Sequence, residues 1–153
     1  FLGDDVVGDN HVGDWGTQFG TLIWAWRNAG SPEDAELSIG DLEELYKTGT
    51  AASKEDPSIA EACRAELAKL QSGDPDNTAL WERFVHISRQ EAERTYDRLG
   101  VTFDTWHGES FYNDALPGVI EKLTTEGLAR EEAEVEEVAE DDEGVSRRSG
   151  AED

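Results

Sequence analysis

The chain has 153 residues, of which 37% are apolar, and 36 acidic against 13 basic residues give it a formal charge of −23. This length suffices for one ordinary domain with a modest core. The single cysteine, Cys63, excludes an intramolecular disulfide and a zinc site made of several cysteines. An acidic surface cannot by itself attract a polyanion at low ionic strength, and no apolar run reaches the roughly 18 residues of a membrane span.

The acidity is spread over the whole sequence. Residues 131–153 carry a balance of −9, so the first 130 residues still carry −14, and only four of the thirteen basic residues are lysine. Such a surface suits a protein that works in high salt, where self-repulsion is screened. We expect a halophilic source; the alternative is an ordinary acidic cytosolic protein. No signal peptide is visible, so a cytoplasmic location is expected.

The first thirty residues predict a strand, a glycine-rich turn and a helix. Val6-Val7 opens a strand candidate that ends at Asn10, and a helix is expected from Thr17 or Gln18 to Asn28. Strand, turn and helix together form the unit of an α/β sheet, whose ligands bind at the carboxyl ends of the strands. Phe1-Leu2-Gly3 has the pattern of a helix end closed by glycine. We therefore expect the chain to be a piece of a longer protein.

The rest of the sequence predicts helices and a tail. Apolar residues at helical spacing indicate four further helices, at residues 37–46, 58–70, 77–99 and 114–126. Residues 101–104 are a second strand candidate. Residues 131–153 have no aromatic residue and little to bury, so we expect disorder or poor helix there.

The most informative segment is the turn itself, Asn-His-Val-Gly-Asp-Trp-Gly-Thr-Gln-Phe-Gly at residues 10–20. Its three glycines allow a sharp turn and a close approach to a ligand. Asp14 can hold a cation, and Trp15 offers a flat wall or a cation–π face. The remaining polar side chains add directional hydrogen bonds: Asn10, His11 and Gln18. A guanidinium or ammonium ligand would find complementary groups here.

A plainer interpretation of the same turn stays open. Asp14 or Thr17 could cap the following helix, with Trp15 in the core. The glycine spacing matches neither the dinucleotide fingerprint nor the phosphate loop, because no Lys-Ser/Thr follows. The residues alone do not decide between a ligand site and a structural turn.

The segment strongly resembles the corresponding motif of arginyl-tRNA synthetases. Further blocks of the resemblance follow in the order of the bacterial-type enzymes, over about 130 residues. These blocks are Phe1-Leu2-Gly3, Leu70–Asp74, Trp81, Thr95–Val101, Gly108–Tyr112 and Leu116–Gly118. A chance match of so many ordered blocks is improbable.

The resemblance implies an α/β fold that is mostly helical. Residues 1–30 would belong to a class I Rossmann-like catalytic domain, residues 31–130 to a helical insertion, and residues 131–153 to an acidic tail. The family joins L-arginine to ATP, with Mg²⁺, as an adenylate and passes the arginyl group to tRNA. Catalysis there is mainly positioning and electrostatic stabilisation. We expect a monomer with no membrane partner.

The resemblance also assigns roles to residues of this chain. The pocket for the amino acid or its adenylate would contain Asn10, His11, Gly13, Asp14, Trp15, Gly16 and Gln18. Asp14, Trp15 and Gln18 are the strongest candidates, and no residue is assigned to catalysis or to a metal. The blocks around Asp97 and at residues 108–112 are interpreted as scaffolding. A metal site from His11, His107 and Glu109 is disfavoured because its ligand set is incomplete.

Two parts of the family pattern are absent from the sequence: the His-Val-Gly-His type signature and the Lys-Met-Ser-Lys-Ser-like loop. This chain alone is therefore not expected to activate arginine. Two other functions remain as alternatives. One is a noncatalytic ligand- or partner-binding helical domain derived from such an enzyme; the other is a purely structural helical module.

Overall fold

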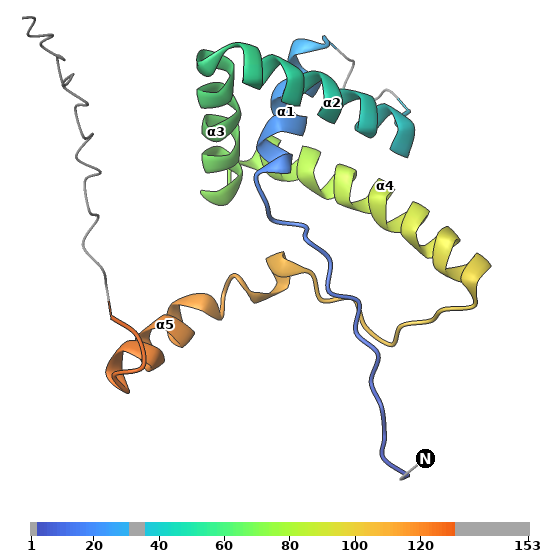
Figure 1. Cartoon of the computed structure of the whole chain (residues 1–153), viewed down its shortest axis with the longest axis vertical. Coiled ribbons are helices and arrows are strands. Elements are labelled where there is room, and N and C mark those ends of the chain that lie inside the picture. Colours follow the sequence, from blue (N-terminus) through green and yellow to red (C-terminus); the bar gives the residue numbers. More distant parts are fainter. Residues whose placement is uncertain (1–2, 31–35, 131–153) are drawn as a thin grey trace, which may run out of the picture. The chain divides into compact units, whose positions relative to one another are not determined.

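The computed structural model describes residues 3–30 and 36–130 (Figure 1). Its helices are α1 (Gln18–Asn28), α2 (Ile39–Glu55), α3 (Pro57–Gln71), α4 (Pro75–Leu99), the short 3₁₀ helix η1 (Glu109–Tyr112) and α5 (Leu116–Thr125). Contacts divide the chain into one unit that ends at Leu116 and a second that begins at Pro117. The expectations for Phe1-Leu2 and for the acidic tail lie outside the described residues.

Local sequence signals explain where the helices begin and end. Ser38 and Asp41 form a reciprocal capping box at the start of α2. Asp56 and Asp74 accept hydrogen bonds from the first turns of α3 and α4, each of which begins with proline. Gly100 ends α4 in the left-handed conformation at φ 68°.

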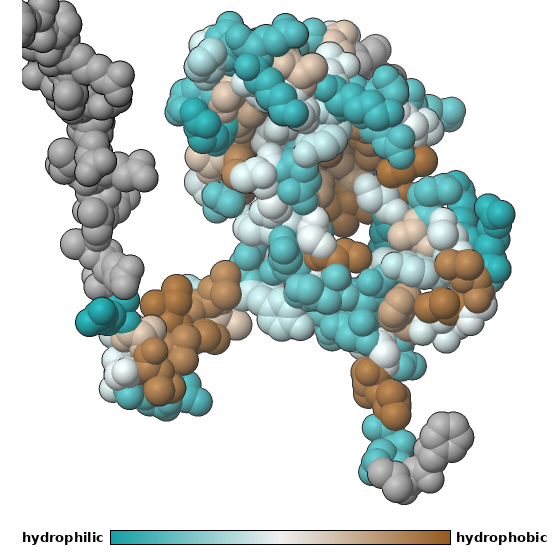
Figure 2. Space-filling model, in the orientation of Figure 1, coloured by the Kyte–Doolittle hydropathy of each residue, from teal (hydrophilic) through white to brown (hydrophobic). Residues whose placement is uncertain are grey.

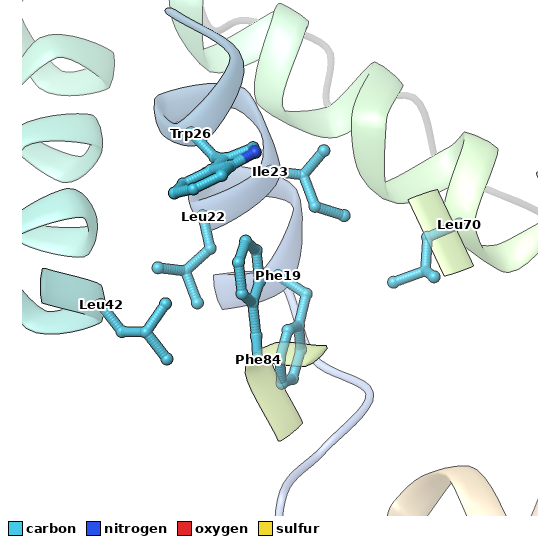
Figure 3. Close-up of a cluster of buried hydrophobic side chains, with 7 residues drawn as sticks. All are labelled: Phe19, Leu22, Ile23, Trp26, Leu42, Leu70 and Phe84. Carbon is cyan, nitrogen blue, oxygen red and sulfur yellow. The ribbon is translucent and has the colours of Figure 1, made fainter. Parts of the chain in front are cut away.

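Helix α1 is the centre of the first unit, because it packs against α2, α3 and α4. Its apolar face meets side chains from each of these helices, and two of the residues, Ile23 and Phe84, are 0% exposed. The buried cluster is Phe19, Leu22, Ile23, Trp26, Leu42, Leu70 and Phe84 (Figure 3). The core of this unit therefore lies directly behind the turn that precedes α1.

Two glycines allow the helices around α1 to approach closely. A Cβ on Gly20 would overlap the backbone oxygen of Cys63 and lie 2.9 Å from the Cβ of Leu67, both in α3. A Cβ on Gly49 of α2 would lie 2.7 Å from Cγ2 of Thr21. Gly20, the last residue of the motif, is therefore a helix-packing residue. The expectation that it brings the backbone close to a ligand is wrong.

A polar network joins α1, α3 and α4 at the edge of this core. Asn77, 0% exposed, accepts a hydrogen bond from Arg27 at 2.6 Å and donates to the backbone and side chain of Glu66 at 2.8 and 3.0 Å. Arg27 and Lys69 form ion pairs with Glu66 at 3.0 and 2.8 Å. This arrangement compensates a largely buried carboxylate with charges and hydrogen bonds.

The helix predictions are confirmed, with one difference in length. Helices at residues 18–28, 58–70, 77–99 and 114–126 agree with α1, α3, α4 and α5 within two residues, whereas α2 continues to Glu55 and not only to Tyr46. The extension is polar in sequence, and its packing through Gly49 against α1 is a long-range contact. Helix propensity depends on the local sequence and therefore does not predict such a contact.

The two strand predictions are wrong for the part of the chain that the structure describes. Residues 3–14 and 101–108 contain no regular strand and share only an isolated parallel bridge between Asp9 and Thr105. Val6 and Val7 remain 84% and 71% exposed. A strand requires a continued ladder of hydrogen bonds with a neighbour, and one bridge does not make a sheet. The mostly helical character of the fold is as expected.

The second unit contains most of α5. Its apolar side chains gather on the surface (Figure 2), where Val119, Ile120 and Leu123 are 50%, 63% and 38% exposed. Gly127 follows the helix with φ 71°. In the described ranges, no helix combines the length and the apolar character that a membrane crossing requires.

Candidate functional site

The glycine turn lies beside a segment that is almost one hundred residues away in the sequence. Residues 8–14 run parallel to residues 104–110, and the paired residues are 95–97 positions apart (Figure 1). Three backbone hydrogen bonds define the pairing: Asp104 N to Gly8 O at 2.8 Å, Asn10 N to Thr105 O at 2.9 Å and Glu109 N to Val12 O at 3.0 Å. We call these two stretches the paired segments.

Asp9 joins the paired segments near their middle. Its Oδ1 accepts hydrogen bonds from the Thr105 hydroxyl at 2.7 Å and from the His107 backbone at 3.1 Å. The Thr105 hydrogen bond, helped by the His107 contacts, holds the pKa of Asp9 below its usual value. His11 adds a contact through Nδ1, which lies 2.8 Å from the carbonyl oxygen of His107. His11 therefore belongs to the pairing.

Asp14 connects the turn to Ser110. One carboxylate oxygen accepts the Ser110 backbone N–H at 2.8 Å, and the other accepts the Ser110 hydroxyl at 2.7 Å. The carbonyl oxygen of Asp14 accepts the indole N–H of Trp81 at 2.6 Å. Thr17 makes no side-chain cap of α1. The part of the plainer interpretation in which the side chain of Asp14 or Thr17 caps the helix is therefore wrong.

Gly108 provides the space in which the Asp14 carboxylate lies. A Cβ at this position would be 2.5 Å from the carboxyl carbon of Asp14. Residues 108–110 contact the turn directly, and their interpretation as scaffolding stays a prediction. In the sequence, the only sign of this contact was that residues 108–112 belong to a block of the family resemblance. The distance along the chain between this block and the glycine turn does not show that the block and the turn meet.

The indole of Trp15 is half-buried and packs edge-on against Trp81, with ring centroids 5.2 Å apart. It borders the buried core, as the plainer interpretation expected. Gln18 donates from Nε2 to the carbonyl oxygen of Gly13 at 2.9 Å. Its amide lies against Gly16, where an added Cβ would overlap it. Gly16 and Gln18 thus fix the shape of the turn from within.

Asn10 differs from the other polar residues of the motif. Its side chain is buried, the residue being 9% exposed, and within the described residues its Nδ2 has no hydrogen-bond acceptor. Buried amide groups are nearly always hydrogen-bonded in native proteins. Asn10 therefore has unused hydrogen-bonding capacity within the paired segments.

A cavity of about 370 Å³ opens beside the turn. Gly13, Asp14, Gln18 and Gly108 line one side, and apolar side chains of α1 and α4 form much of the rest. Three of the seven predicted binding residues therefore share one cavity, whereas Asn10, His11, Trp15 and Gly16 do not line it. A larger hollow of about 510 Å³, between α1 and α2, contains none of the seven.

Aromatic side chains hold the second of the paired segments on α4. Tyr96, Phe103 and Trp106 contact one another with centroid distances of 5.0 to 5.9 Å. Arg89 stacks over Trp106 at 4.8 Å and pairs with Glu93 at 2.8 Å. This cluster places Trp106 in the wall of the cavity. The sequence analysis included Tyr96 in a resemblance block and Phe103 in a strand candidate but did not predict that they meet Trp106.

The cysteine and histidine residues show no sign of a metal site. Across residues 3–30 and 36–130, no group of three potential metal ligands among His, Cys, Asp and Glu is found. Cys63 is buried in the contact of α3 with α1, and burial raises the pKa of its thiol. A structural role for Cys63 agrees with this position.

Comparisons with known proteins define the class. A family model for the catalytic domain of class I tRNA synthetases (R) matches residues 1–145. The arginine–tRNA ligases of Fusobacterium nucleatum and Chloroflexus aggregans are each 45% identical to the chain, over 130 and 132 residues. A solved arginyl-tRNA synthetase from Plasmodium falciparum superposes with a TM-score of 0.69 at 29% identity and covers 86% of the chain.

By these matches, the chain is part of the catalytic domain of a class I tRNA synthetase. The chain belongs to the arginyl-tRNA synthetase family. The two bacterial matches include 84% and 85% of the chain. The chain spans only 23% of the length of each of these relatives and 22% of the Plasmodium chain.

Proposed function

We propose that the chain is part of an arginine–tRNA ligase and that the paired segments form part of its site for L-arginine or the arginyl-adenylate. The observation that carries this proposal is the contact between Asp14 and Ser110. It joins two separate blocks of the family resemblance next to one cavity. The contact brings the two blocks together, as a site made of both blocks requires.

The whole ligase would join arginine to ATP, with Mg²⁺, as an adenylate and transfer the arginyl group to tRNA. The residues that we place at the arginine are Asn10, His11, Gly13, Asp14, Trp15, Gly16 and Gln18. Their contribution is positioning, since a preformed site lowers the entropic cost of reaction. We assign residues 1–30 to the catalytic core and residues 31–130 to a helical insertion.

The cellular setting is part of the same proposal. A ligase that charges tRNA is expected in the cytoplasm, where aminoacyl-tRNA is used, and we propose that it acts as a monomer. The charge of −23 with four lysines supports a protein adapted to high salt.

The test is arginine-dependent exchange of labelled pyrophosphate into ATP by the full-length ligase that contains this chain. We expect exchange with L-arginine and none with L-lysine, whose ammonium lacks the planar guanidinium fork. The 153-residue chain alone is expected to give no exchange. Exchange that requires a different amino acid, or none by the full-length protein, would contradict the proposal.

A further inference from the structure

Helix α4 holds the paired segments at two places. Trp81 donates from its indole N–H to the carbonyl oxygen of Asp14 at 2.6 Å, and this hydrogen bond attaches the first segment to the helix. Further along α4, Arg89 lies over the ring of Trp106 in the second segment, with its guanidinium carbon 4.8 Å from the ring centroid. Both segments of the proposed site are therefore attached to the same helix.

Trp106 stands between two residues that contact the first segment. On one side, Thr105 accepts a hydrogen bond from the backbone of Asn10 at 2.9 Å and donates its hydroxyl to Asp9 at 2.7 Å. On the other side, the backbone N–H of His107 donates to Asp9 at 3.1 Å. A displacement of Trp106 would move both neighbours and disturb these contacts across the pairing.

The ring of Trp106 is held by contacts of two kinds. Tyr96 and Phe103 meet it edge-on, with centroid distances of 5.9 and 5.8 Å. Arg89 stacks on it, and the Arg89 guanidinium is itself oriented by an ion pair with Glu93 at 2.8 Å. An exposed ion pair alone contributes little, but a planar guanidinium on an indole adds a cation–π contact. We call this arrangement the Arg89–Trp106 stack.

The Arg89–Trp106 stack also borders the cavity beside the glycine turn. Both residues line this cavity together with Gly13, Asp14 and Gly108 of the paired segments. The position of the stack therefore affects the shape of the cavity as well as the pairing.

We propose that Arg89 and Trp106 are positioning residues for arginine binding. Their stack holds residues 104–110 where they pair with residues 8–14, and it acts through this pairing without contact with the ligand. The inference rests on the proposed function, in which the paired segments form part of the arginine site. Because α4 lies in the region that we assign to the helical insertion, the insertion would help to set the geometry of a site in the catalytic core.

The first experiment compares Arg89→Met with wild type in the full-length ligase. Methionine keeps an unbranched side chain but removes the planar cation and the ion pair with Glu93. We expect the KM for L-arginine in pyrophosphate exchange to rise about two- to fivefold, the factor of one lost cation–π contact, while kcat changes by less than about twofold. The unfolding midpoint should stay at its wild-type value, because the Arg89 side chain is 50% exposed.

Arg94→Met is the matched control. Arg94 is an exposed arginine of the same helix and pairs with Glu91 at 3.1 Å. Its replacement removes the same charge and the same kind of ion pair from α4. Both kinetic constants of this variant should therefore stay at wild-type values.

Substitutions of Trp106 test the aromatic half of the stack. Trp106→Leu should raise the KM for L-arginine about tenfold, because the contacts with Tyr96 and Phe103 are lost together with the contact to Arg89. Trp106→Phe keeps an aromatic face and should give a KM between those of wild type and Trp106→Leu. The double variant with Arg89→Met should have no higher KM than Trp106→Leu alone, because both substitutions remove one shared contact.

The second experiment does not depend on catalysis. The backbone N–H groups of Asn10 and His107 donate across the pairing, so their hydrogen–deuterium exchange reports its opening. Without L-arginine, peptides that contain these groups should exchange at least about threefold faster in Arg89→Met than in wild type, whereas peptides of α1 and α3 should be unchanged. Arg94→Met should exchange like wild type throughout.

Three results would overturn the inference. The first is a wild-type KM for L-arginine in an active Arg89→Met ligase, and the second is an equal rise in KM in Arg94→Met. The third is wild-type hydrogen–deuterium exchange of the paired segments in Arg89→Met. A wild-type ligase without arginine-dependent pyrophosphate exchange would contradict the proposed function alone, since the hydrogen–deuterium exchange still tests the stack.

Discussion

Replacing Gly20 with alanine is expected to lower the free energy of unfolding by about 3 kcal/mol, the upper part of the usual range for overpacking. The added Cβ would overlap the backbone oxygen of Cys63 and lie 2.9 Å from the Cβ of Leu67. A backbone oxygen inside α3 cannot rotate away as a flexible side chain can. Helix α3 must therefore move away from α1, and contacts of the buried cluster are lost.

The matched control is Gly40→Ala in α2. An added Cβ there meets only the Ser38 hydroxyl oxygen, at 3.6 Å, which is an ordinary contact. Alanine favours a helix by roughly 1 kcal/mol over glycine, so this variant should be as stable as wild type or more stable. Denaturant unfolding of both variants measures the difference. Equal stability of the two variants would show that α1 and α3 are not in close contact at Gly20.

Asn77→Ala is expected to cost about 2–3 kcal/mol, because buried groups that lose a hydrogen-bond partner cost roughly 1–3 kcal/mol each. The amide is 0% exposed and bonds to Arg27 and to Glu66, whose side chain is 12% exposed. Asn28→Ala, which removes an exposed amide bonded to the preceding turn of its own helix, should cost less than about 0.5 kcal/mol. Unfolding free energies of the two variants should separate clearly; similar costs would contradict a central role for Asn77.

The same network makes stability depend on pH. Burial alone would raise the pKa of Glu66, but hydrogen bonds from Lys69 and Asn77 and the charge of Arg27 outweigh it and hold the pKa below its ordinary value of 4.5. A carboxylate with a lowered folded-state pKa stabilises the fold above its unfolded pKa. This contribution is lost as the pH falls below 4.5 and through the folded-state pKa. The dependence should be weaker in Asn77→Ala than in wild type, as unfolding from about pH 6 to about pH 3 would show.

The sequence predicts the helices well because their signals are local. In the structure, Ser38, Asp56 and Asp74 cap the starts of three helices and Gly100 ends α4, all through contacts within a few residues of the chain. The strand at Val6-Val7 was not predictable in the same way. A strand depends on a neighbour, and the described residues offer only Thr105 as a bridge partner for Asp9. A residue with high β-propensity fits well into a sheet, but it forms a strand only where a neighbouring strand is present.

The glycine turn was identified correctly as unusual, but the roles of its residues were only partly predictable. From its chemistry alone, Asp14 is expected to bind a cation. In the structure, its carboxylate accepts two hydrogen bonds from Ser110. The difference arises from a contact across 96 residues, which no spacing rule reports. Trp15 follows the plainer interpretation and borders the core. Of the three glycines in the motif, Gly20 serves helix packing.

The central claim is that residues 8–14 and 104–110 act together as one site for arginine. Hydrogen–deuterium exchange of the full-length ligase, with and without L-arginine, tests it most directly. The account predicts that backbone amides of both stretches gain protection with L-arginine and not with L-lysine at equal concentration. Protection confined to one stretch, or found only elsewhere in the ligase, would contradict it.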